Sequence, residues 1–125
     1  MLEELIAYVF ARCPGVRHYK NNLLNRAGSS EIDVCFWNKR RLGSLDFLPR
    51  GLLVIECKNT HRRVSSSAVR VFRTKLVDMG LRNGILVASN GVTGNSDRLN
   101  AAHDAIRTAF QVERVRIIVI TRSEL

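Results

Sequence analysis

The fold of this chain is decided by one stretch, Val54-Ile55-Glu56-Cys57-Lys58-Asn59, in which an apolar run ends in an acid and a base. Residues 52–55 are all apolar and predict a buried strand that turns polar at Glu56. Side chains two apart on a strand share a face, so Glu56 and Lys58 are expected to project together at its end. Charges at such a place need compensation, which a salt bridge or a metal ion with a phosphate would provide.

A second acid lies on the strand expected before this one. Residues 31–37 alternate in polarity, which places Glu31, Asp33 and Cys35 on one face. If the two strands pair, Asp33 lies beside Glu56, and two close carboxylates repel each other unless a cation relieves them. Oxygen ligands with retained waters suit Mg²⁺ or Mn²⁺, so a metal site at Asp33 and Glu56 is predicted. A structural salt bridge at a strand end is the alternative.

Periodicities along the rest of the chain predict an α/β domain. Short loops between the early strands favour antiparallel pairing, and the later strand–helix–strand segments favour parallel pairing. The predicted order is αβββαβαβ, a mixed β-sheet flanked by helices in a single domain over residues 1–125. Phe36 and Trp37 are expected in its core. Helices are predicted over residues 2–12, 65–80 and 96–110, and further strands over 16–26, 85–89 and 115–121.

The charge of the chain points to a polyanionic partner. Twenty Lys and Arg stand against 11 Asp and Glu, a net charge of +9, and 16 of the 20 are arginines. The planar guanidinium grips phosphate oxygens in two places, so the composition is typical of nucleic-acid binding, although arginine-rich codon usage would also produce it. The candidate nucleic-acid contacts are Arg62, Arg63, Arg70, Arg73 and Thr93. For the arginines, the alternative is a basic face that only contacts solvent. For the loop with Asn90, Thr93 and Asn95, the alternative is that these residues only form a turn.

Cysteine usage and the N-terminus bear on the cellular setting. Cys13, Cys35 and Cys57 are odd in number and form no CxxC or Cys/His cluster, which argues against a disulfide framework or zinc site and favours the cytoplasm. The N-terminal apolar run starts with acids and is too short to span a membrane, so no membrane association is expected.

Three motifs carry a family resemblance. They are GSSEIDV at 28–34, LVIECKN at 53–59 and GILVASNGVT at 84–93, and they occur in this order over most of the chain. Together they resemble the PD-(D/E)XK nuclease superfamily, and most closely its Mrr-like restriction endonuclease branch. The resemblance implies a restriction endonuclease-like fold and Mg²⁺- or Mn²⁺-dependent hydrolysis of DNA. The chain departs from it where no Pro precedes Asp33 and where Glu31 replaces the Gly of Mrr relatives.

The resemblance also assigns roles to individual residues. Asp33 resembles the metal-binding Asp of the family, Glu56 its second metal ligand, and Lys58 its catalytic Lys. Glu3 resembles the acid on the first helix because it borders the apolar stripe, whereas Glu4 is expected to face solvent. Glu31 is either an additional acid at the site or a solvated strand residue.

The resulting hypothesis is a metal-dependent endodeoxyribonuclease of Mrr type. A homodimer is expected, because cutting both strands requires two active sites. A structure-specific nuclease similar to the Holliday-junction resolvases is one alternative, and RNA stays open as the substrate. A non-catalytic nucleic-acid-binding module is another alternative, against which the complete acid–acid–lysine set argues.

Overall fold

The computed structural model describes residues 2–13, 15–24, 31–38, 51–93 and 101–124, without the side chains of 18–24, 31, 32 and 101. The predicted start of a helix at 96–100 lies outside these ranges, as do Asn95 and the side chain of Glu31. The predicted order αβββαβαβ is confirmed, with a short 3-10 helix η1 (Arg122–Glu124) after the last strand. The residues divide into two compact units, 1–57 and 58–125.

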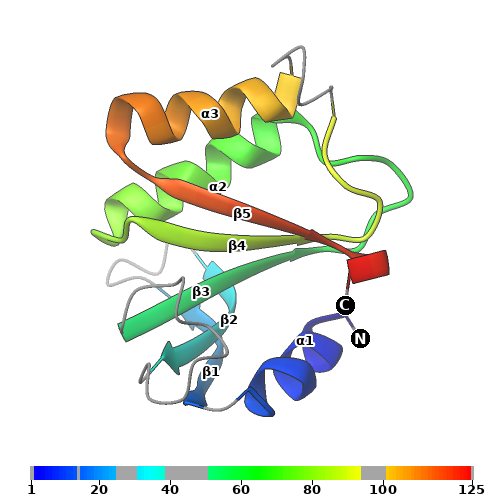
Figure 1. Ribbon diagram of the computed structural model, residues 1–125, viewed down its shortest axis with the longest axis vertical. Helices are drawn as coiled ribbons and strands as arrows, with labels where there is room; N and C mark the ends of the chain where they lie inside the picture. The colour runs from blue at the N-terminus through cyan, green and yellow to red at the C-terminus, as the bar shows by residue number, and fades with distance from the viewer. Residues whose placement is uncertain (1, 14, 25–30, 39–50, 94–100, 125) are drawn as a thin grey trace. The chain divides into compact units, whose positions relative to one another are not determined.

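The first unit contains helix α1 (Leu2–Ala11) and strands β1 (Val16–Leu24), β2 (Glu31–Asn38) and β3 (Gly51–Lys58), the last residue of which begins the second unit. Ile6 and Phe10 are buried one turn apart on α1. The ring of Phe10 lies 5.4 Å from that of Phe36 on β2, so α1 is fixed against the sheet by aromatic packing. In Figure 1 this helix lies beside β1 and β2.

The three strands of the first unit form an antiparallel sheet, as the short connections predicted. The register of β2 against β3 runs from Asn38 opposite Gly51 to Val34 opposite Ile55. Phe36 is fully buried, but the expectation of a core position is wrong for Trp37, whose side chain is 46% exposed. The strand alternation explains the difference, because Trp37 points to the face opposite that of Phe36.

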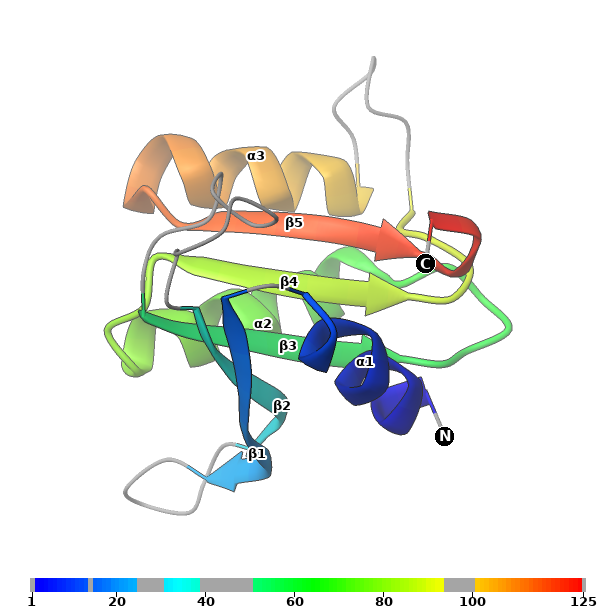
Figure 2. The same cartoon turned by 60° about the horizontal axis from the view of Figure 1, so that its bottom comes forward.

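The second unit contains helices α2 (Ser66–Asp78) and α3 (Ala101–Glu113) and strands β4 (Asn83–Ala88) and β5 (Arg116–Thr121). The two strands are parallel neighbours, as predicted for strands joined through a helix. Helices α2 and α3 pack side by side and run along β4 and β5 (Figures 1 and 2). The strand order β1-β2-β3-β4-β5 makes the sheet mixed, so the predicted fold class is confirmed.

Local chemistry sets the two ends of α2. The hydroxyl of Ser65 accepts a hydrogen bond of 3.3 Å from the Ala68 N–H and so caps the N-terminus of the helix. At the other end, Gly80 takes φ +70°, and Leu81 donates its N–H to the Leu76 carbonyl at 2.8 Å. This turn stops the helix at Asp78, two residues before the predicted end.

Close packing between α2 and β4 gives a stability prediction. A Cβ atom added at Gly84 would lie 2.7 Å from Cζ of Phe72 and 2.8 Å from Cδ1 of Leu76. Gly84→Ala is therefore expected to lower the free energy of unfolding by about 1–3 kcal/mol, since overpacking forces buried side chains to move. Urea denaturation measures the change. The exposed-site variant Val71→Ala on α2 is the control and is expected to change stability by less than about 0.5 kcal/mol. Equal stability of the two variants would show that the helix yields without cost.

Candidate active site

The predicted neighbours Asp33 and Glu56 lie across from one another at the end of the β2–β3 pairing. The register ends with Val34 opposite Ile55, and the next residues outward on the two strands are Asp33 and Glu56. Residues opposite each other on antiparallel strands share a face, so the two carboxylates belong to the same side of the sheet. Both lie in the first compact unit.

Asp33 is oriented by the backbone of the neighbouring strand. Its Oδ2 accepts a hydrogen bond of 2.7 Å from the Cys57 N–H. The side chain thus continues the hydrogen bonding between the strands beyond the last paired residues. This short hydrogen bond fixes the orientation of the Asp33 carboxylate. Its other oxygen, Oδ1, is then the one that could bind a ligand.

The environment of Glu56 and Cys57 is strongly acidic. Glu56 is only 5% exposed, although it is a carboxylate. The pKa of the half-buried Cys57 thiol is raised to about 12, first by burial and then by the charges of Asp33, Glu3 and Glu56 in that order. Three carboxylates therefore act together on one point at the end of β3. Ile55 is fully buried, as predicted for residues 52–55, and Cys57 is half-buried.

The two acids of α1 differ in their surroundings. Glu3 is half-buried and its charge acts on the Cys57 thiol, whereas Glu4 is exposed. Glu3 is thus the α1 acid that the structure brings toward Asp33 and Glu56.

Lys58 is the last residue of β3 and follows Glu56 by two positions. Its side chain is half-buried, and strand alternation turns it to the same face as that of Glu56. Its carbonyl accepts hydrogen bonds of 3.1 Å from both the N–H and the hydroxyl of Ser89, which follows β4. The backbone of the strand is therefore held by hydrogen bonds up to the lysine itself.

The donor set suits a hard cation that keeps some of its waters. Among the described residues, no group of three His, Cys, Asp or Glu side chains is gathered closely enough to hold a metal by protein ligands alone. Two carboxylates, with a third nearby, are the usual protein contribution to a Mg²⁺ site, where water and substrate phosphate complete the octahedron. The oxygen donors of Asp33 and Glu56 fit that pattern.

The predicted nucleic-acid contacts fall into two groups. Arg62, Arg63 and Arg70 are exposed. Arg73 is half-buried and forms an ion pair with Glu113 at the end of α3, a partner that no local sequence pattern indicated. Thr93 is half-buried, and its Oγ1 accepts a hydrogen bond of 3.3 Å from the Ala102 N–H. The first group can reach a ligand directly, whereas the second is already engaged within the protein.

The raised pKa of Cys57 leads to a prediction about its reactivity. At pH 8 a thiol with a pKa near 12 holds far less thiolate than one with the ordinary value of 9.0. Part of this loss is offset because a more basic thiolate is more nucleophilic, which leaves alkylation roughly 30-fold slower. Mass spectrometry of the iodoacetamide-treated native protein measures the rate, with the urea-unfolded chain as reference. Equal rates at Cys57 in both would contradict the acidic, buried environment.

The mixed α/β fold is the fold class that the nuclease resemblance implied. A family model described as restriction endonuclease, of the Mrr catalytic type, matches residues 1–125. The chain therefore belongs to this restriction endonuclease family, and the resemblance to the Mrr-like branch is confirmed.

No curated protein matches the chain. Among solved structures, it is similar to the MspJI restriction endonuclease in complex with a 27-mer oligonucleotide, with 17% sequence identity and a TM-score of 0.49. The alignment covers 98% of this chain but 25% of that one, so this chain spans about a quarter of the length of that protein. None of the helices within the described ranges is long and apolar enough to cross a bilayer.

Proposed function

We propose that this chain is a Mg²⁺-dependent endonuclease that hydrolyses DNA phosphodiester bonds, with Mn²⁺ as a substitute ion. The observation that carries the proposal is the placement of Asp33 opposite Glu56 at the end of the β2–β3 pairing. Membership of a restriction endonuclease family supports the reaction class. We further propose that the two compact units constitute one catalytic domain, since a single family model spans both.

In this proposal the acids hold the ion and the lysine assists the water. Asp33 Oδ1 and the carboxylate of Glu56 are assigned to the ion, and Glu3 adds negative charge from α1. When bound, a divalent ion neutralises charge on the scissile phosphate and lowers the pKa of a coordinated water. Lys58 orients the attacking water or stabilises charge that develops on the phosphate. The hydrogen bond from Cys57 N–H fixes the orientation of Asp33 throughout.

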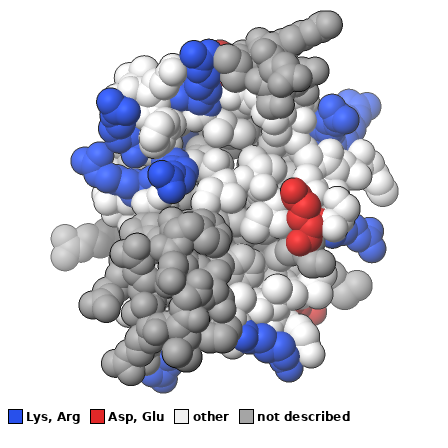
Figure 3. Space-filling view, in the orientation of Figure 1, with Lys and Arg blue, Asp and Glu red and all other residues white. Residues whose placement is uncertain are grey.

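The partner proposed for this site is DNA, bound by a strongly basic second unit. Residues 58–125 hold twelve Lys and Arg against five Asp and Glu, a net +7, whereas residues 1–57 hold eight against six, a net +2. Outside the area drawn in grey, the face in Figure 3 shows several separate basic side chains and less acidic surface. Exposed Arg62, Arg63 and Arg70 are proposed phosphate contacts. Arg73 and Thr93 are proposed to support the binding surface through their internal hydrogen bonds.

A homodimer acting in the cytoplasm completes the proposal. Two active sites are needed to cut both strands of a duplex, and the chain supplies one acid–acid–lysine set. The three cysteines are free thiols, which suits a reducing compartment.

The test is a cleavage assay of the purified protein on linear, methylated, branched and single-stranded DNA, and on RNA, with Mg²⁺ or EDTA. The proposal expects internal cleavage of at least one DNA substrate that EDTA abolishes. Preference for the branched DNA would point to the resolvase-like activity. Binding without cleavage of any substrate in Mg²⁺ or Mn²⁺ would refute the enzymatic function.

A further inference from the structure

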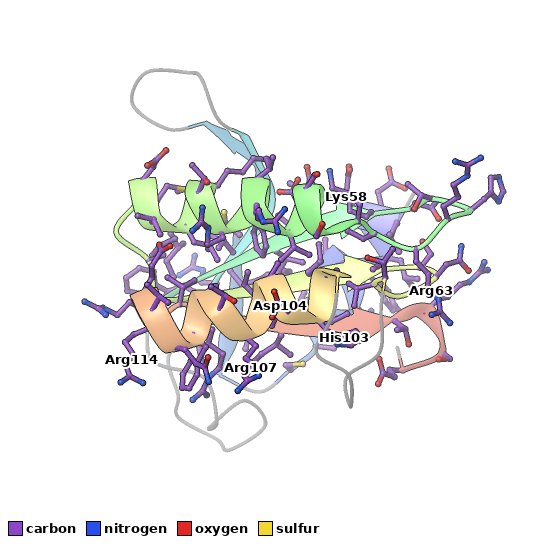
Figure 4. All side chains as sticks on the ribbon, turned by 90° about the horizontal axis from the view of Figure 1, so that it is seen from above. Lys58, Arg63, His103, Asp104, Arg107 and Arg114 are labelled. Carbon is purple, nitrogen blue, oxygen red and sulfur yellow. The ribbon has the colours of Figure 1, made fainter. Side chains whose placement is uncertain are left out.

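A cavity of about 480 Å³ opens in the second unit, beside the start of α2. Its lining includes the side chains of Lys58, His61, Arg62 and Arg63 and the apolar side chains of Val64 and Ala68. The volume lies within the range of about 300–1,000 Å³ that small-molecule sites occupy. Figure 4 shows Lys58 and Arg63 at this end of α2, with Arg114 at the far end of α3.

The loop that forms the cavity is held in place by its own hydrogen bonds. The hydroxyl of Thr60 donates a hydrogen bond of 2.6 Å to the Arg62 carbonyl, which closes a tight turn over residues 60–62. The amide of Asn90 donates to the Thr60 carbonyl from the loop that follows β4. The loop therefore presents its cations from a fixed backbone, and less ordering is needed when a ligand binds.

A second attachment lies at the other end of the loop. The N–H of Val64 donates to the Gly91 carbonyl at 2.8 Å, and the Val64 carbonyl accepts from the Thr93 N–H at 2.9 Å. Val64 and Val92 form a parallel β-bridge between these bonds. The residues after β4 thus frame the basic loop, which gives the motif around Asn90 and Thr93 a structural purpose that sequence reasoning did not find.

The charged side chains that line the cavity are all basic. None of the residues placed by the structure adds an acidic side chain to its lining. Arg62 and Arg63 are exposed, and within the described part of the chain neither guanidinium forms a salt bridge. Two guanidinium groups, an imidazole and an ammonium around one space favour a phosphate, which guanidinium binds in a bidentate manner. The apolar side chains of Val64 and Ala68 suit contact with the sugar that carries the phosphate.

We propose that this cavity is a phosphate subsite that holds a phosphate of the DNA strand beside Lys58. The inference rests on the proposed function, because Lys58 both lines the cavity and is assigned to the reaction. Arg62 and Arg63 hold the phosphate, and Val64 and Ala68 contact the sugar. The phosphate is either an internal phosphodiester of the strand or a 5′-terminal monophosphate, and the same side chains serve both.

The test measures DNA binding in EDTA, so that it depends on neither a metal nor cleavage. Fluorescence anisotropy compares the full-length protein with the double variant Arg62→Ala/Arg63→Ala. The matched control, Arg107→Ala/Arg114→Ala, removes the same charge from α3 and from the residue that follows it, away from Lys58 (Figure 4). The Arg62/Arg63 variant is expected to weaken binding about tenfold. The slope of log K against the logarithm of the salt concentration is expected to become shallower by about two, one for each phosphate that is no longer neutralised. The control is expected to change affinity less than about twofold, and thermal melting checks that both variants are folded.

Two otherwise identical oligonucleotides, one with a 5′-phosphate and one with a 5′-hydroxyl, distinguish the sources. If the wild type prefers the 5′-phosphate and the Arg62/Arg63 variant does not, the ligand is a terminal phosphate. If the variant weakens both oligonucleotides equally and more than the control does, the ligand is an internal phosphodiester. Equal reductions in affinity in the two double variants would overturn the subsite, whatever the cleavage assay shows. If the wild type cleaves no DNA but the Arg62/Arg63 variant binds DNA more weakly than the control variant does, the proposed nuclease activity is refuted and the phosphate subsite stands.

Discussion

Asp33→Asn is expected to lower the rate of DNA cleavage in Mg²⁺ at least about 100-fold and to leave the fold intact. The amide oxygen of Asn can still accept the hydrogen bond that Cys57 N–H donates to Asp33. The substitution thus removes the charge while it preserves the hydrogen bond between β2 and β3. A 100-fold drop in rate corresponds to a loss of about 3 kcal/mol of transition-state stabilisation. We expect this loss because the variant binds the metal ion more weakly.

The control for this variant is Glu4→Gln, which removes one negative charge from the exposed side of α1. It is expected to retain cleavage within about twofold, because an exposed charge in water interacts weakly with the site. Single-turnover cleavage measured at several Mg²⁺ concentrations separates weaker metal binding from slower chemistry. If Asp33→Asn and Glu4→Gln cleave equally well, Asp33 is not a metal ligand.

Lys58→Met is expected to lower the cleavage rate by about 10²–10³-fold, the cost of losing one donor aimed at developing charge. Met retains much of the apolar stem of the half-buried lysine, so the packing at the end of β3 is preserved. Unlike the Asp33 variant, Lys58→Met is expected to bind Mn²⁺ as well as the wild type does, since the acids are unchanged.

The matched control is Arg107→Met on α3, which also replaces one cation by Met (Figure 4). It is expected to alter the cleavage rate by no more than about threefold, through the general attraction of DNA. Cleavage of DNA by purified Lys58→Met at the wild-type rate would remove the lysine from the mechanism. Loss of Mn²⁺ binding in the same variant would show instead that it disturbs the acids.

The central pair of acids could be placed from the sequence because strand periodicity carries the necessary information. Alternation over residues 31–37 and the apolar run at 52–55 identify two strands, and antiparallel pairing of such neighbours brings Asp33 beside Glu56. The same alternation places Trp37 on the face opposite that of Phe36. The hydrophobicity of Trp37 led to the prediction that it lies in the core. That prediction is wrong because alternation along the strand decides which face each side chain occupies, and Trp37 is exposed.

Interactions between residues far apart in the chain had no sequence signal. The pairing of Arg73 with Glu113 joins two helices across 40 positions, and charge patterns report only neighbours on one helix. The hydrogen bond from Asn90 to the Thr60 carbonyl joins two loops 30 residues apart. Turn propensity explains why each loop forms, whereas their mutual support depends on how the strands before them are placed.

The most direct measurement of metal binding by the two acids is the anomalous difference map of a crystal soaked in Mn²⁺. We predict a peak within about 2.0–2.3 Å of carboxylate oxygens of both Asp33 and Glu56, with water completing an octahedral shell. The Asp33→Asn crystal, soaked in parallel, is expected to lose most of the peak. An empty map at Asp33 and Glu56, in crystals that bind Mn²⁺ elsewhere, would contradict a metal-dependent site at these residues.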